Sequence, residues 1–398
     1  MNPIQAKPKR ITIMCPAHAL GDERVVCRQA LTLAQAGHEV LVLARHDPEK
    51  SPPQHPGLRL EPVGPMTRGA SFRARLGKIQ ALYVCYRRAC ASAPDLLAAH
   101  EPETALLGLL ISRRKNIPIH FDVHECFDEL LASRVSPRLS GVVKRLVWSA
   151  LSWIARRCDY VTVVSPTTQR QYQAVCGDRR VDILHNSPPM ELFPLCEQTP
   201  AGPLTVCHEG WLDLVRGMRQ LLQAIAVAGR QIPVRLLVVG KLGGGCAALF
   251  DSLVKELGIG EQVTVTGWLP YAEVGRVDAT AQVGAVTLQP SGNNNGSLSN
   301  KVYSYMACGQ AAIVPKDSAT AELIAQHECG LAVDVTKPEE IAQAIVRLAR
   351  DPALRQTLGQ NGRRAIERHL GWHVMSGRLV SAYGDLLSGK RLHREDAS

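Results

Sequence analysis

The 398-residue sequence is poor in aromatic side chains, since Phe, Trp and Tyr together make up only 5% of it. It contains no run of about 18 uncharged apolar residues, so we expect no ordinary membrane-spanning helix. The basic residues at the start lead directly into a strand-like segment, so we expect no signal peptide. The apolar content of 45% excludes a disordered chain, and the length favours two domains of about 200 residues each.

The twelve cysteines include no C-x-x-C pair, and the two that come closest have no histidine at metal-finger spacing. We therefore expect reduced thiols that act as small apolar side chains in a cytoplasmic protein, with no metal site. The glycosylation sequon at 295–297 carries no meaning without export.

Several nucleotide-binding and hydrolase motifs are also absent. No G-x-G-x-x-G follows the first strand, and neither G-x-x-x-x-G-K-[ST] nor G-x-S-x-G occurs. These absences disfavour a standard nicotinamide site, a P-loop ATPase and an α/β-hydrolase. The glycine run at 243–245 is only a weak phosphate-loop signal.

The net charge of +10 is concentrated in the first half of the chain. Residues 1–195 contain 26 Lys and Arg against 17 Asp and Glu, or +9, and the remainder contains 20 against 19, or +1. We expect any anionic partner, nucleic acid or a membrane face, to bind the first half, unless these charges only solvate helix faces. Nucleic acid is disfavoured because few aromatics are available for stacking. The basic residues concerned are Arg68, Arg73, Arg75, Lys78, Arg87, Arg88, Arg113, Arg114, Lys115, Lys144, Arg145, Arg156 and Arg157.

Short β-type runs alternate with helical segments along the whole chain. In the first part we expect strands at 11–15, 38–44, 58–63, 95–99, 117–123, 160–164 and 181–184, and helices at 22–36, 71–92, 102–115, 139–157 and 166–175. In the second part we expect strands at 204–207, 234–239, 263–266, 283–288 and 311–314, and helices at 214–229, 246–257, 271–279, 299–308, 319–327 and from 338 onward.

Five prolines between 187 and 203 indicate a linker between these two parts. The alternation predicts an α/β protein with two Rossmann-like, doubly wound parallel-sheet domains that face a cleft. We expect the domains over 1–190 and 204–370, the linker over 191–203, and a C-terminal helix over 371–398 that can pack back on the first domain. Ligands of such folds bind at the carboxyl ends of the strands.

The segment 291–309 is the most informative one, because a loop rich in Gly and Asn leads into a helix whose first turn holds Asn300 and Lys301. Free backbone N–H groups, the helix dipole and a lysine together attract phosphate. The alternative is a surface helix capped by Ser297 or Ser299.

Arg216-Gly217 stands at the start of the first helix of the same domain. Arg216 could reach the same cleft as Lys301, and two converging cations suit a departing diphosphate. Taken alone, Arg216 fits a solvated surface residue as well.

In the first domain, His124 follows a strand that we expect to be buried, so it points to the cleft and could exchange a proton near neutral pH. A structural histidine is the alternative. Gly21 ends the loop after the first strand, where it permits close approach of a ligand. The helix 139–157, with Trp148 and Trp153, is either a membrane-docking helix or a core helix with a basic outer face.

Taken in this order, these positions resemble a GT-B glycosyltransferase of the family 4, group 1 type over nearly the whole chain. The resemblance rests on the stretches 36–40, 121–125, 159–165, 184–186, 216–224 and 297–309. It implies a nucleoside-diphosphate sugar bound mainly by the second domain, an acceptor bound mainly by the first, retention of anomeric configuration, and no cofactor or metal.

Carried over residue by residue, the resemblance places the donor diphosphate on Arg216 and Lys301, with Gly217, Ser297, Leu298 and Asn300 along it. It places His124 beside the reacting sugar and Gly21 near the phosphate or the acceptor. Family members usually carry a glutamate that grips the ribose where this chain has Ser304, and the other usual glutamate falls on Gly296. The loss of one charge-assisted hydrogen bond at Ser304 corresponds to about 1.5–3 kcal/mol of donor binding.

The sequence therefore predicts a hexosyl-transferring enzyme that uses a polysaccharide, lipid-linked or small-molecule acceptor, in the cytoplasm or on the inner face of a membrane. The two departures motivate an alternative, a catalytically silent GT-B protein that binds a glycan or a partner subunit. A nucleotide-sugar epimerase of the same fold is a further alternative.

Overall fold

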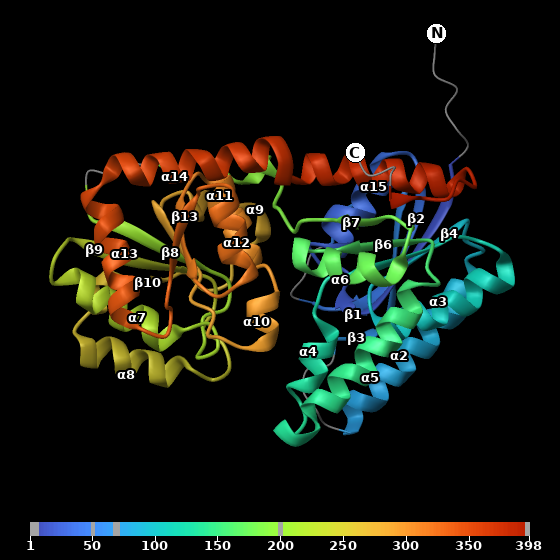
Figure 1. The fold of residues 1–398 in the computed structure, drawn as a ribbon, viewed down its shortest axis with the longest axis horizontal. Coiled ribbons are helices and arrows are strands. Elements are labelled where there is room, and N and C mark those ends of the chain that lie inside the picture. The colour runs from blue at the N-terminus through green and yellow to red at the C-terminus, as the bar shows by residue number, and fades with distance from the viewer. Residues whose placement is uncertain (1–7, 49–51, 67–71, 198–201, 395–398) are drawn as a thin grey trace, which may run out of the picture. The chain divides into compact units, whose positions relative to one another are not determined.

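The computed structural model describes residues 8–48, 52–66, 72–197 and 202–394, which form two compact units (Figure 1). The first unit comprises Met1–Leu184 and Met375–Ser398, and the second comprises His185–Val374. Arg68 of the predicted basic set and Pro200 of the proline-dense segment lie outside the described residues. Each unit is described here by itself.

The first unit is built on a seven-stranded parallel sheet in the order β3-β2-β1-β4-β5-β6-β7. Its strands are β1 (Arg10–Ala19), β2 (Glu39–His46), β3 (Leu58–Pro65), β4 (Leu96–Ala99), β5 (Ile119–Val123), β6 (Tyr160–Val163) and β7 (Val181–Ile183). Its helical segments are η1 (Val25–Ala30), α1 (Leu31–Gln35), α2 (Phe72–Ala91), α3 (Pro102–Lys115), α4 (Phe127–Ala132), α5 (Pro137–Ala155), α6 (Pro166–Cys176) and most of α15 (Trp372–Leu387).

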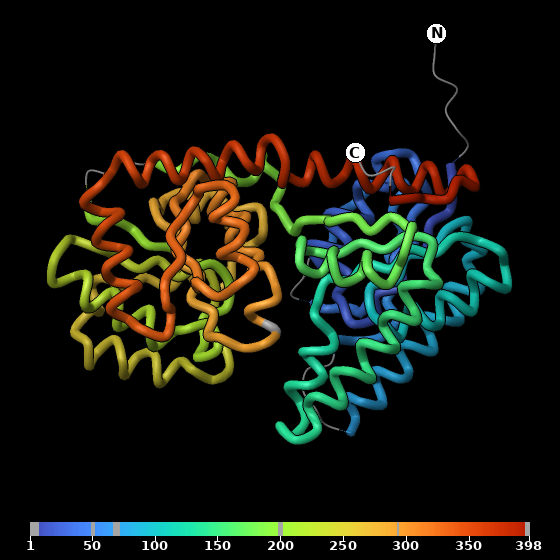
Figure 2. Tube along the Cα trace, viewed as in Figure 1, coloured from blue at the N-terminus to red at the C-terminus, as the bar shows by residue number. Residues whose placement is uncertain are grey.

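The central strands of this sheet are covered on both faces. Every residue of β4 and β5 is buried, as expected of apolar parallel strands between two helical layers. One layer includes α2, α3 and α5, which follow one another in contact. The C-terminal helix α15, red in Figure 2, belongs to the same unit and joins the sheet through a 2.8 Å hydrogen bond between Tyr383 and His120 of β5.

The second unit is built on a six-stranded parallel sheet in the order β10-β9-β8-β11-β12-β13. Its strands are β8 (Leu204–Glu209), β9 (Val234–Val239), β10 (Val263–Val265), β11 (Val283–Ala285), β12 (Ala311–Pro315) and β13 (Gly330–Val333). Its helical segments are η2 (Met190–Leu192), α7 (Met218–Gly229), α8 (Ala247–Leu257), η3 (Gly260–Gln262), α9 (Tyr271–Asp278), α10 (Gly292–Gly296), α11 (Asn300–Ala307), α12 (Ala319–Gln326), α13 (Pro338–Arg350), α14 (Pro352–Ala365) and η4 (Ile366–Leu370).

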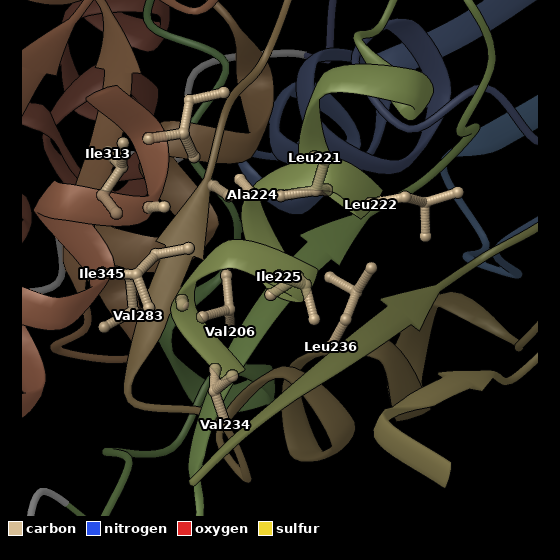
Figure 3. Packing of buried hydrophobic residues seen from close by; sticks show 14 of the residues in the cluster. Val206, Leu221, Leu222, Ala224, Ile225, Val234, Leu236, Val283, Ile313 and Ile345 are labelled. Carbon is tan, nitrogen blue, oxygen red and sulfur yellow. The ribbon is translucent and has the colours of Figure 1, made fainter. Parts of the chain in front are cut away.

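Two apolar clusters pack against this second sheet. In one of them, strand residues such as Val206 and Leu236 meet Leu222 and Ile225 of α7 and Ile345 of α13 (Figure 3). The other cluster is formed largely by α11 and α12 together with Ala312 and Val314 of β12. The two parallel sheets confirm the predicted pair of Rossmann-like domains. The prediction succeeded because continuous hydrophobic strands are typical of parallel sheets that helices cover on both faces.

The structure corrects the sequence prediction at several elements. The helix predicted from residue 22 begins at Val25 and consists of a π-helical and an α-helical part, η1 and α1. The helix predicted from residue 214 begins at Met218, because Gly217 has a positive φ of 76°. The short elements α4, α10 and β13 were not predicted, since each carries too few residues to show a period.

The proline-dense segment does not run free between the domains. Its first residues belong to the second unit, where Phe193 is fully buried in an apolar cluster and its carbonyl accepts a 3.0 Å hydrogen bond from Arg363. All twelve cysteines are free. Among the described helices, none is both long and apolar enough to span a bilayer.

Candidate functional site

In both sheets the strand order reverses at the first strand. The next strands along the chain extend the sheet on one side of it, and the later strands extend the sheet on the other side. The reversal lies between β1 and β4 in the first unit and between β8 and β11 in the second. The loops that follow such neighbouring strands diverge and leave a crevice at the carboxyl edge of the sheet. The candidate residues cluster at this edge in each unit.

In the second unit, the loop after β8 and the start of α11 bring Arg216 and Lys301 to one place. Arg216 donates to Asp213 at 2.5 Å, and the Asp213 carboxylate also accepts the Arg216 backbone N–H at 2.9 Å. Lys301 forms no hydrogen bond or ion pair with any described residue. Its Nζ would lie 3.9 Å from a Cβ placed on Gly210, so it faces the loop after β8.

Arg216 lies near enough to Lys301 to affect its pKa. Burial lowers the pKa of Lys301 and the charge of Arg216 acts in the same direction, whereas the carboxylates of Glu209, Asp213 and Asp278 raise it. Burial and the same two cations lower the pKa of His208 to about 3, so this imidazole is neutral. Arg216 and Lys301 thus share this site with the carboxylates of Glu209, Asp213 and Asp278.

Gly217 is the residue that lets the helix α7 start directly after Arg216. Its φ is 76°, and a Cβ there would lie 2.2 Å from the carbonyl oxygen of Thr287. The Thr287 hydroxyl in turn donates to the Arg216 carbonyl at 2.7 Å. The glycine thus permits a close backbone approach that fixes the position of the arginine.

The residues around the N-terminus of α11 differ in exposure. Asn300 is exposed, Ser297 is half-buried, and Leu298 packs into the apolar core. Ser299 occupies the N-cap position but its side chain forms no capping bond, so neither predicted capping serine is shown to cap the helix. Ser304 is buried on the inner face of α11, so no carboxylate stands at this position.

In the first unit, three neighbouring strands each carry a histidine at or just after their carboxyl ends. His18 lies at the end of β1, His100 follows β4, and His124 follows β5. The Nε2 atoms of His18 and His124 are 3.1 Å apart. His18 Nδ1 lies 3.0 Å from the carboxylate of Asp22, which is adjacent to the buried Gly21.

Beneath these histidines, Asp122 forms a fully buried ion pair with Arg24. The two guanidinium contacts measure 2.7 and 3.0 Å, and Gln29 and Thr162 donate to the same carboxylate at 2.9 and 2.6 Å. Burial alone would raise the pKa of Asp122, but the charge of Arg24 and the neighbouring His100 hold it well below its ordinary value. This ion pair fixes the end of β5 and hence the position of His124.

His100, Asp122 and His124 offer three ligand atoms within 4.8 Å of one another. Both Asp122 oxygens are already used by donors, among them the Arg24 guanidinium. A second cation at this place would have to displace them. The arrangement therefore fits a structural ion pair better than a metal site.

The sequence analysis named Gly21, His124, Arg216 and Lys301, and the structure places each of them at the carboxyl edge of its sheet. It did not name the residues that surround them, which are His18, Asp22, Arg24, Glu101, His208, Glu209 and Asp213. The polar spacing His18-x-x-x-Asp22-x-Arg24 at the end of the first strand could have indicated these residues. Charged side chains so close to a buried strand usually have a partner.

In the comparison with protein families, a different family model matches each of the two parts of the chain. The family model described as Glycosyltransferase Family 4 matches residues 21–188, and the model described as Glycosyl transferases group 1 matches residues 197–365. A phosphatidyl-myo-inositol mannosyltransferase of Mycolicibacterium smegmatis is 25% identical over 387 residues, which cover 94% of this chain and 93% of that protein.

Solved structures agree on the fold. Sucrose-phosphate synthase from Thermosynechococcus elongatus superposes with a TM-score of 0.74 at 19% identity, over 96% of this chain and 100% of that one. Anabaena HepE in complex with UDP gives a TM-score of 0.70 at 15% identity, over 95% and 100%.

Proposed function

Because the chain belongs to the GT-B glycosyltransferases of the family 4, group 1 type, we propose that it is a retaining enzyme that transfers a hexose from a nucleoside-diphosphate sugar. The observation that carries this proposal is the pair Arg216 and Lys301, of which Lys301 is half-buried and forms no hydrogen bond or ion pair with a described residue. The UDP complex of a protein of the same fold is consistent with a diphosphate as the ligand of these two cations.

In the proposed reaction, Arg216 and Lys301 bind the donor diphosphate and neutralise the charge that develops when the sugar–phosphate bond breaks. Gly217, Asn300, Ser297 and Leu298 lie along the same nucleotide. Ser304 replaces the carboxylate that usually grips the ribose, and this favours a donor whose affinity rests on its phosphates. His124 faces the sugar and Gly21 allows the phosphate or acceptor to approach the backbone.

Among the acceptors, we propose a lipid-linked glycan reached at an anionic membrane surface. Helix α2 buries only small residues, Ala74, Ala81, Cys85 and Ala89, toward the core. Four of its large apolar side chains are exposed instead, and they recur at helical spacing on one stripe formed by Phe72, Leu76, Ile79 and Tyr83. Nothing in the first unit covers this stripe among the described residues.

The neighbouring helices continue the apolar surface. Leu139, Val142 and Leu146 are exposed on α5, at intervals of three and four residues, and Leu106 and Leu110 are exposed on α3. Helices α2 and α5 together contain eight basic and no acidic residues. An apolar stripe flanked by cations suits the interface of an anionic bilayer.

Only one of the two tryptophans of α5 is available for the predicted membrane contact. Trp148 packs inward against Tyr172 with ring centroids 5.3 Å apart, and Trp153 is partly exposed beneath the Arg157 guanidinium. The leucines and valines of the first turns, rather than the two tryptophans, therefore form the proposed contact with lipid.

Vesicle flotation tests the membrane proposal. The protein should float with vesicles that contain about 30% phosphatidylglycerol, bind pure phosphatidylcholine weakly, and detach as salt rises. The variant Ile79→Ser/Leu146→Ser should lose about tenfold or more in binding, since each buried leucine-sized side chain contributes roughly 1.5–3 kcal/mol. Leu195→Ser, which changes an equally exposed leucine of the second unit, is the matched control. Equal binding of both variants would contradict the proposal.

A nucleotide screen tests the function itself. Thermal unfolding should shift upward with UDP or GDP and their sugars, and less with the nucleoside monophosphate, because ligand bound to the native state raises its stability. NMR of the product should then show the donor's anomeric configuration retained. No response to any nucleotide would indicate a silent GT-B protein, and conversion of the sugar without acceptor would indicate an epimerase.

A further inference from the structure

The contact between His18 and His124 constrains where protons lie at the proposed sugar site. His124 Nδ1 lies 3.4 Å from the carbonyl oxygen of Asp122, and a carbonyl can only accept. His124 therefore carries its proton on Nδ1, and its Nε2 holds a lone pair. His18 Nε2, at 3.1 Å, must then donate to that lone pair.

The other side of His18 also donates. Its Nδ1 lies 3.0 Å from Asp22, whose carboxylate accepts two backbone N–H groups, from Arg24 and Val25, at 3.0 and 2.9 Å. Two donating nitrogens make His18 an imidazolium. Glu101, 3.8 Å from His18 Nε2 and anchored by the backbone N–H of Ala17, adds a second carboxylate beside it.

The pKa shifts of the two histidines agree with these proton positions. Burial lowers the pKa of His18, but Asp22, Glu101 and Asp122 outweigh burial and raise it to about 9. Burial and the positive charge of His18 lower the pKa of His124 to about 3, with Arg24 and His100 in the same direction and Asp122 opposed. At neutral pH the pair holds one extra proton, on His18.

We propose that His18 is a positioning residue for His124, holding its Nε2 as an acceptor and leaving Nδ1–H as the group that donates to a hydroxyl of the donor sugar. The long 3.4 Å contact to the Asp122 carbonyl leaves that N–H available for a better acceptor. Both histidines are half-buried rather than sealed, so a sugar can reach them. This inference rests on the proposed function of His124.

Imidazole NMR on the ligand-free protein tests the proton positions without any activity. His18 should stay doubly protonated up to about pH 9, and His124 should stay neutral with its proton on Nδ1 between pH 5 and 8. His38, elsewhere in the first unit, is the reference for signal assignment through His38→Gln. Titration of His18 near pH 6.5, or a His124 proton on Nε2, would overturn the proposal.

Kinetics test the positioning role. His18→Ala should lower kcat about 10- to 100-fold, the size of one lost charged hydrogen bond, while the Kd for UDP on the second unit stays unchanged. The native enzyme is expected to lose activity as the pH rises through about 9. His18→Gln, which retains a neutral N–H donor, should recover part of kcat and should show no such fall. If the native protein does not bind UDP, the proposed function is refuted. If kcat is unchanged in His18→Ala, only the positioning role is refuted.

Discussion

Lys301→Ala is expected to weaken the binding of UDP or GDP by about 100-fold. Lys301 is half-buried near Arg216 and forms no hydrogen bond or ion pair with a described residue, so a phosphate can supply its first charged hydrogen bond. A charged hydrogen bond is worth roughly 1.5–3 kcal/mol, which corresponds to about 10- to 150-fold in Kd. Isothermal titration calorimetry with the nucleoside diphosphate measures the effect.

Two comparisons make this result specific. Lys337→Ala changes an exposed lysine of the same unit that pairs with Glu340, and it should leave the Kd unchanged. Arg216→Ala should weaken binding less than Lys301→Ala, because Asp213 already balances part of the Arg216 charge. Unchanged diphosphate binding in Lys301→Ala would show that the phosphates bind elsewhere.

Arg24→Met is expected to lower the free energy of unfolding by about 3–5 kcal/mol. The substitution keeps most of the side-chain volume but leaves the buried Asp122 carboxylate without its bidentate partner. It also removes the 3.0 Å hydrogen bond to the carbonyl of Leu184, so the ends of β5 and β7 lose a common anchor. Urea denaturation of the native and variant proteins measures the difference.

The control for this change is Arg10→Met, since Arg10 pairs with Asp95 on the surface at 3.7 Å. An exposed pair of this kind contributes about 1 kcal/mol or less. Because the folded pKa of Asp122 is lowered, its stabilising contribution is fully present above about pH 4 and is lost as the pH falls toward the folded value. A variant as stable as Arg10→Met would show that the Arg24–Asp122 pair does not hold the site together.

The sequence predicted the second unit's site better than the first unit's site. Lys301 and Arg216 each follow a local signal, a helix start after a Gly- and Asn-rich loop in one case and an Arg-Gly step in the other. His124 also had a local signal, since it follows a buried strand. Its partner His18 lies 106 residues away, and no local pattern reports such a distance.

The proposed membrane-binding surface rests on structural evidence that differs in part from the sequence signals that suggested it. Charge counting pointed to the first half of the chain, and Trp148 and Trp153 pointed to the helix 139–157. The exposure of Leu76 and Ile79 could not be predicted, because an apolar stripe at helical spacing normally faces a core. Only the packed structure shows that the residues α2 buries fully are small and that Phe72, Leu76, Ile79 and Tyr83 are exposed.

The sequence by itself determined the alternation of strands and helices, the two parallel sheets and the positions of four candidate site residues. These properties follow from the local hydrophobic period and from glycine and proline, which act within a few residues. The tertiary structure decided which charges meet: Arg24 with Asp122, His18 with His124, and Arg216 with Lys301. Proton positions and pKa values depend on burial and on neighbours brought from distant strands, so they exist only once the sheets have formed.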